Sequence, residues 1–273
     1  MRTKNLGRTV ALFAATALVS ACGGGGSTTL PLGPGPPDLT PVTTDVPVGG
    51  WWTGTTMTTS GQQEKLELLA LVAEDGRACL LQEDGVMFWG TLQSSGDRLT
   101  STLVGAGLVG MPLRDGSASG TGTVSGRIWE RSSIVATQDF TTEAGSRTVS
   151  TLALTYQSMY DDDSSLATIA GNYADALGLS GGVLNIASTG DLFLQDPDSG
   201  CVINGRVALI NAAYNAYDVQ LSYSSCTGLD AMFNGVTFSG LAAYDRASGE
   251  AVALVHGSVG STPYAAAFVF ERL

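Results

Sequence analysis

The sequence predicts an all-β protein made of two tandem antiparallel up-and-down meanders of about eight strands each, barrel-like in form. Residues 217–224 alternate apolar and polar side chains without an error, which is the period of a strand with one buried face. From Trp51 onward, turn signals recur about every 8 to 12 residues, the spacing typical of β-sandwiches and barrels. No stretch after residue 21 sustains a helical period, and 36 glycines interrupt the chain.

In the first half, residues 66–72 and 77–82 flank Glu74-Asp75-Gly76, whose Asp-Gly pair suits a tight primed turn. Residues 148–156 alternate and close this half. In the second half, Ser188-Thr189-Gly190 marks another hairpin. The eight strands predicted there cover residues 171–177, 182–187, 191–196, 201–210, 217–225, 233–244, 250–258 and 264–272.

The two halves resemble each other, which indicates an internal duplication. Thr123-Val124-Ser125-Gly126 precedes Thr237-Phe238-Ser239-Gly240 by 114 residues, and residues 148–156 match 262–270 at the same spacing. Two further matches pair Trp89-Gly90 with Asn204-Gly205 and Gly50-Trp51-Trp52 with Gly171-Asn172-Tyr173. Eight antiparallel strands joined by short turns can close on themselves and remove both exposed edges. The alternative is one larger sandwich built from both halves.

The N-terminus has the pattern of a secretory signal peptide, predicted over residues 1–21. Arg2, Lys4 and Arg8 precede an apolar stretch at residues 10–19, which is too short to span a bilayer. Residues 22–49 form a predicted tether, rich in glycine and containing six of the nine prolines. The first repeat is then expected over residues 50–160, a linker over 161–170 and the second repeat over 171–273.

Val19-Ser20-Ala21-Cys22 resembles the lipobox of bacterial lipoproteins. The resemblance implies cleavage before Cys22 and acyl chains, such as palmitate, held by that residue. Gly23, where inner-membrane lipoproteins carry Asp, implies sorting to the outer membrane by the enterobacterial pattern. The Gly run after Cys22 is similar to tethers of surface-exposed lipoproteins of Gram-negative bacteria, including the transferrin-binding and factor H-binding types. We therefore expect a lipid-anchored protein of the outer membrane, facing the periplasm or the cell surface.

The charge balance argues against nucleic acid as a partner. The chain carries 25 acidic and 13 basic residues, and removing residues 1–21 takes away three of the basic ones and none of the acidic ones. A phosphate backbone requires a clustered cationic face, and the sequence has none. The expected contact with the membrane is through the N-terminal lipid only.

The cysteines agree with an oxidising compartment. The predicted strands 201–210 and 217–225 form a hairpin whose turn includes residues 213–214. Cys201 and Cys226 lie symmetrically about this turn, so a disulfide at the base of the hairpin is predicted. The register that puts Val207 and Val219 on one face is off by one residue for this bridge, so a bulge or an irregular strand end must absorb the difference. Cys79 is left over, and we expect a buried, unreactive thiol.

Signals for catalysis, metals and cofactors are weak, and none is predicted. The string from Gly105 to Gly110 matches a dinucleotide fingerprint, but the helix that this motif requires does not follow it. The acidic runs at residues 161–163 and 196–198 lack both the Gly and the Glu of an EF-hand loop. His256 is the only histidine and falls within a predicted strand. A hydrolase that uses two carboxyl groups in one pocket, both with raised pKa, is disfavoured but not excluded.

All four tryptophans belong to the first half. Trp51, Trp89 and Trp129 are candidates to line a ligand cavity, as aromatic side chains do in carrier barrels. The alternative is that these rings only fill the core.

Three functional hypotheses follow. The first is a non-catalytic, lipid-anchored binding or interaction module of the cell envelope, with a protein or glycan as its partner. The second is a lipocalin-like carrier of a small apolar ligand. The third, least favoured, is the carboxylate-dependent hydrolase.

Overall fold

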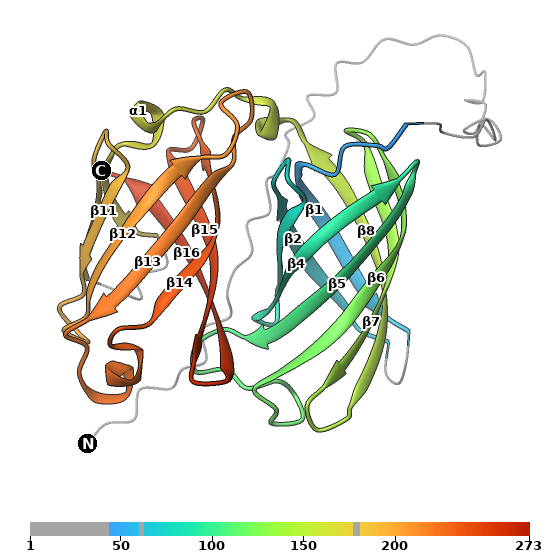
Figure 1. Cartoon of the computed structure of the whole chain (residues 1–273), viewed down its shortest axis with the longest axis horizontal. Helices are drawn as coiled ribbons and strands as arrows, with labels where there is room; N and C mark the ends of the chain where they lie inside the picture. Colours follow the sequence, from blue (N-terminus) through green and yellow to red (C-terminus); the bar gives the residue numbers. More distant parts are fainter. Residues whose placement is uncertain (1–43, 60–62, 177–180) are drawn as a thin grey trace, which may run out of the picture.

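The computed structural model describes residues 44–59, 63–176 and 181–273, which form two closed eight-stranded antiparallel barrels side by side (Figure 1). The all-β, two-meander prediction is confirmed, and the single sandwich is wrong because each sheet closes on itself. The predicted signal peptide, Cys22 and most of the tether lie outside the described residues.

Barrel 1 closes by pairing its first strand with its eighth, so that Thr53 lies opposite Thr155. Lumen-facing and outward residues alternate along each strand, and Trp52 is fully buried in the resulting core. The strands are β1 (Gly50–Thr58), β2 (Lys65–Val72), β3 (Arg77–Gln82), β4 (Val86–Ser95), β5 (Arg98–Gly107), β6 (Ser119–Trp129), β7 (Ser133–Thr142) and β8 (Arg147–Gln157).

Barrel 2 closes in the same way, between its first strand and the C-terminal strand, where Asp175 lies opposite Phe270. Its strands are β9 (Gly171–Asp175), β10 (Val183–Ile186), β11 (Asp191–Gln195), β12 (Val202–Leu209), β13 (Tyr217–Ser224), β14 (Thr237–Asp245), β15 (Glu250–Val259) and β16 (Thr262–Arg272). A short 3₁₀ helix, η2 (Gly228–Phe233), lies between β13 and β14.

The barrels repeat one another strand for strand, and their registers correspond. Gly90 on β4 and Gly205 on β12 are equivalent, as the sequence match predicts. A Cβ at Gly90 would lie 2.3 Å from the carbonyl oxygen of Thr102, and one at Gly205 would lie 2.2 Å from that of Gln220. Only glycine permits this close approach of neighbouring strands, so both barrels keep it at the same place.

The match at a spacing of 114 residues selects the correct strands but the wrong register. Strand pairing equates Leu154 with Phe270 and Ile128 with Tyr244, a spacing of 116 residues. A slip of two residues leaves every side chain on the same face of its strand, so the alternation of the sequence cannot reveal it.

The segments flanking barrel 1 are integrated into the fold. Residues 45–49, which the sequence assigned to the tether, lie against barrel 1, where Val48 is buried and the Val46 N–H donates to the Gly96 carbonyl at 3.0 Å. After β8 come η1 (Ser158–Asp161) and α1 (Leu166–Ile169). Buried Asn215 holds this linker, because its amide donates to the carbonyls of Met159 at 3.1 Å and Tyr244 at 2.7 Å.

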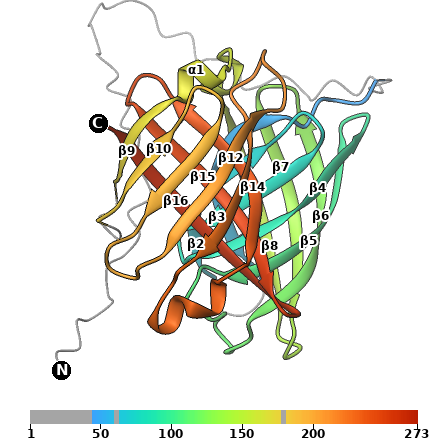
Figure 2. The ribbon, with the colours of Figure 1, turned by 60° about the vertical axis from the view of Figure 1, so that its left-hand side comes forward.

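The two barrels share an apolar joint. It is formed mainly where β2 and β3 of barrel 1 meet β14 and β15 of barrel 2, and Figure 2 shows these strands next to each other. Its buried residues are Trp51, Leu71, Ala73, Cys79, Leu81, Met87, Tyr160, Ala216, Leu241, Ala243, Leu254 and Ala265. Burial raises the pKa of the Cys79 thiol to about 12, which agrees with the unreactive cysteine that the sequence predicts.

Polar contacts surround this joint. Arg77 of barrel 1 forms an ion pair with Asp218 of barrel 2. Trp89 and His256 stack with ring centroids 4.8 Å apart. The Val109 N–H donates to the Ala265 carbonyl at 2.9 Å, so the loop after β5 is hydrogen-bonded to β16. The joint therefore fixes that loop to barrel 2.

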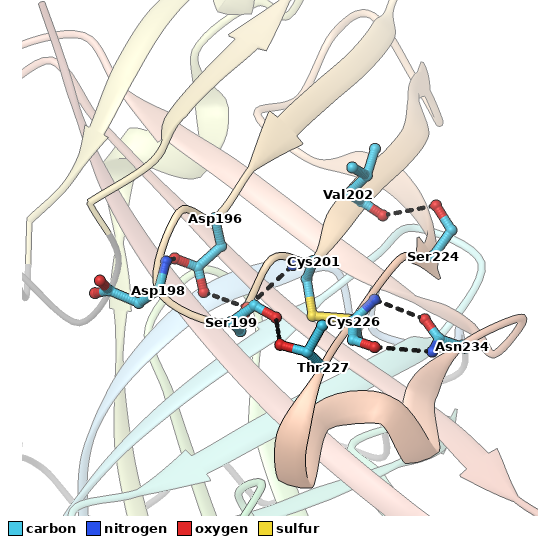
Figure 3. Close-up of a disulfide and its surroundings, with 9 residues drawn as sticks. All are labelled: Asp196, Asp198, Ser199, Cys201, Val202, Ser224, Cys226, Thr227 and Asn234. Carbon is cyan, nitrogen blue, oxygen red and sulfur yellow. Dashed lines mark hydrogen bonds between the residues drawn. A yellow bond between two sulfur atoms is a disulfide. The ribbon is translucent and has the colours of Figure 1, made fainter.

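Cys201 and Cys226 form the predicted disulfide at the end of the β12–β13 hairpin (Figure 3). The mismatch of one residue is absorbed by Ser225, whose φ of 60° ends the regular strand. Asn234 then holds Cys226, accepting from its N–H at 2.8 Å and donating to its carbonyl at 3.1 Å. In the adjacent turn, the Asp196 side chain accepts from the Asp198 N–H at 3.1 Å, so this acidic run serves as a turn.

Replacing both Cys201 and Cys226 by alanine should lower the free energy of unfolding by about 3 kcal/mol. The bridge closes a segment with a sequence separation of 25 residues and limits the freedom of the unfolded chain. Urea unfolding followed by circular dichroism measures the loss, and reducing the wild-type protein should reproduce it. Equal stability of the variant and the oxidised wild type would contradict this role.

Candidate functional site

The three tryptophans proposed as cavity residues do not meet in a lumen. In the alternation of each strand, Trp51, Trp89 and Trp129 all take outward positions. Trp51 belongs to the joint, Trp89 stacks on His256 at its edge, and Trp129 is 42 % exposed. The tryptophan inside barrel 1 is Trp52, one residue away from a predicted position.

The lumen of barrel 2 is almost filled. It leaves a cavity of only about 40 Å³, lined by apolar side chains such as Leu184, Ile203 and Phe270. At its lower end in Figure 1, Phe233 of η2 packs against the rings of Tyr223, Phe238 and Tyr264. Such a lumen has room for about one water molecule, since each occupies about 30 Å³ in the liquid.

Barrel 1 has a cavity of about 370 Å³ at the corresponding end. The aromatic residues Tyr223, Phe238 and Tyr264 of barrel 2 correspond to Gly105, Gly122 and Thr148 in barrel 1. The apolar part of its lining consists of Leu66, Val86, Phe88, Leu113 and Phe140. The rings of Phe88 and Phe140 occupy the space beside Gly105 and Gly122, so the open space in barrel 1 lies beside Thr148, which stands in the place of Tyr264.

Polar side chains from three neighbouring strands line one side of this cavity. Gln138 on β7 lies opposite Ser150 on β8, which lies opposite Thr58 on β1. Gln138 is only 3 % exposed, and its Nε2 has no hydrogen-bond partner among the described residues. Buried Thr56, two residues from Thr58, also leaves its hydroxyl without a partner in the described part of the chain. An unpaired buried donor is costly, so the Gln138 amide, which lines the cavity, suits a bound acceptor.

The loop between β5 and β6 covers the mouth of the cavity. Leu113 is buried against the core of barrel 1, and the exposed Arg114 next to it forms ion pairs with Glu64 and Asp84. Asp115 accepts hydrogen bonds from the Thr142 hydroxyl and from the Ser117 N–H. The same loop is held to barrel 2 through Val109, so its position depends on both barrels.

The carboxyl groups at this mouth have pKa values shifted in different directions. Burial raises the pKa of Asp84, whereas the hydrogen bond from Arg114 lowers that of Glu64. Hydrogen bonding, first of all from Thr142, lowers the pKa of Asp115. The disfavoured hydrolase hypothesis requires two carboxyl groups with raised pKa in one pocket, and of these three only Asp84 has one.

Gln138 was not predicted as a site residue, although the sequence pattern of its strand marks it as unusual. Ile134, Ala136 and Phe140 mark the buried face of β7, and Gln138 interrupts them with an amide. A polar residue in an otherwise apolar register indicates either a buried hydrogen bond or a ligand.

Comparison of the chain with protein-family models, with curated proteins and with solved structures found no match. Within residues 44–59, 63–176 and 181–273, no helix is long and apolar enough to cross a membrane. The same residues contain no group of three or more His, Cys, Asp or Glu side chains arranged to hold a metal ion.

Replacing Gln138 by leucine should raise the free energy of unfolding of the ligand-free protein by about 1 kcal/mol, because it removes a buried donor that has no partner. Gln93→Leu is the matched control, since Gln93 is exposed on the outer face of the same barrel. Urea unfolding compares the two variants with the wild type. A destabilised Gln138→Leu variant would show instead that the amide supports the fold.

His256 should make the protein sensitive to acid. Burial lowers its pKa, so below the usual value of about 6.5 the unfolded chain binds a proton that the folded chain resists. Stability is therefore expected to fall as the pH drops through 6.5. In His256→Phe, which keeps an aromatic ring against Trp89, the fall between pH 7.5 and 5.5 should be shallower. One group contributes at most about 1.4 kcal/mol per pH unit, and parallel curves for both proteins would refute the assignment.

Proposed function

We propose that the protein is a non-catalytic binding protein of the bacterial outer membrane, anchored through lipid on Cys22. We also propose that barrel 1 holds a small ligand in its cavity of about 370 Å³. The observation that carries this proposal is the buried, unpartnered amide of Gln138 facing a cavity of about 370 Å³. Cavities of about 300 to 1,000 Å³ are typical of small-molecule sites, and this one is lined by five apolar and ten polar or charged residues.

The lipid anchor and the outer-membrane location rest on the sequence. The lipobox-like residues before Cys22, Gly23 after it and the Gly- and Pro-rich tether support them. The mass of the N-terminal peptide of the purified protein tests the anchor, since acylation of Cys22 adds the mass of its acyl groups.

The carrier function is favoured over a protein or glycan partner by the difference between the two lumens. Barrel 2 shows that this fold can be filled by its own side chains, as in its Phe233 and Tyr264 cluster. Barrel 1 keeps an open cavity and also keeps polar groups there, at a cost in stability. A binding role accounts for both features. The ligand we propose has a polar end, unlike the purely apolar one expected from the tryptophans.

Native mass spectrometry of the mature protein, released by mild detergent from the membranes of its own host, tests the proposal. We expect a reproducible extra mass on the wild type and on Gln93→Leu, lost on denaturation, and a reduced fraction of this species on Gln138→Leu. An empty wild-type protein would overturn the carrier function and direct the search to protein or glycan partners. An adduct that Gln138→Leu retains in full would place the ligand outside this cavity.

A further inference from the structure

We infer that the ligand of barrel 1 is an uncharged amphiphile that buries a carbonyl or similar acceptor oxygen at Gln138 and packs its short apolar part against Phe88, Phe140 and Leu113. This inference rests on the proposed function and adds the chemical class of the ligand. A carboxylate such as a fatty-acid anion is the class that it excludes.

The polar groups define the inner end of the ligand. The Nε2 of Gln138 has two hydrogens to donate. This atom is buried and lacks a partner among the described residues, and Gln138 lines the cavity. An ester, amide or ketone oxygen can accept from such donors, whereas an alkyl group would leave them unpaired.

The apolar residues define the rest of the ligand. Phe88 and Phe140 form an edge-to-face pair with centroids 5.1 Å apart, and Leu66 and Leu113 line the cavity with them. A volume of about 370 Å³ admits roughly a dozen non-hydrogen atoms, at the roughly 30 Å³ that one water occupies in the liquid. A chain of medium length therefore matches the volume of the cavity.

The charges of the site exclude an anionic head group. Among the described residues that line the cavity, Arg114 is the only basic one, and its ion pairs with Glu64 and Asp84 already engage its charge. Asp115 adds a further negative charge to the mouth. A carboxylate bound at Gln138 would have no free cation beside it, and burying an unpaired charge costs several kcal/mol.

A series of three probes with the same eight-carbon main chain tests this assignment by isothermal titration calorimetry at pH 7.5. The probes are methyl octanoate, octanoate and octyltrimethylammonium, which differ in the charge of the head group. On the delipidated wild-type protein we expect methyl octanoate to bind at least tenfold more tightly than either charged probe. In Gln138→Leu its affinity should fall about tenfold, because one hydrogen bond is lost, and Gln93→Leu should retain it.

The outcomes separate the two proposals. If octanoate or the ammonium probe binds as tightly as the ester, the inferred ligand class is wrong and the cavity remains a binding site. If the ester binds best but Gln138→Leu retains its affinity, the assignment of the acceptor to Gln138 is wrong. If none of the probes binds, both the ligand class and the carrier function of this cavity fail. The wild-type series decides the ligand class even if a variant does not fold.

Discussion

The interior of an eight-stranded barrel is just wide enough to be filled by its own side chains or to hold one small ligand, and this limit on volume underlies the difference between the two halves of the molecule. In barrel 2, the rings around Phe233 fill the end of the lumen. In barrel 1, the Phe88 and Phe140 rings occupy the space beside Gly105 and Gly122, and only Thr148, in the place of Tyr264, borders an open volume. Two copies of one architecture thus differ in how completely their lumens are filled, without any change in strand order.

The joint links the mouth of the barrel 1 cavity to barrel 2. The β5–β6 loop places Leu113 over the mouth of barrel 1 and, a few residues earlier, pairs with Ala265 of barrel 2. The stack of Trp89 on His256 and the ion pair of Arg77 with Asp218 lie around the same joint. Because packed interfaces respond to strain as units, a change in the joint is expected to reach the mouth of the cavity through this loop.

The sequence was sufficient for the architecture but not for the cavity. Alternation and turn signals are local properties, so they predicted the strands, the two barrels and, from the positions of Cys201 and Cys226, the disulfide. Which of Trp51 and Trp52 points into the barrel depends on the strand register. Two adjacent tryptophans in the sequence do not reveal that register. The cavity depends on closure, because only the pairing of β8 with β1 brings Thr58 beside Ser150 and Gln138. The sequence match at a spacing of 114 residues was two residues away from the structural equivalence. It therefore did not show which lumen residues of the two barrels correspond.

The joint is heterologous, because the β2–β3 face of one barrel contacts the β14–β15 face of the next, and strand equivalence gives each barrel both kinds of face. Contacts of this type can repeat without end and build fibres. Here most outer-face positions differ from the joint: Leu241 and Leu254 correspond to the exposed Ser125 and Thr137, and Leu71, Leu81 and Trp89 to the exposed Asn185, Gln195 and Asn204, whereas Cys79 corresponds to the exposed Phe193. The polar replacements make these faces less suited than the joint to repeated barrel-to-barrel contact.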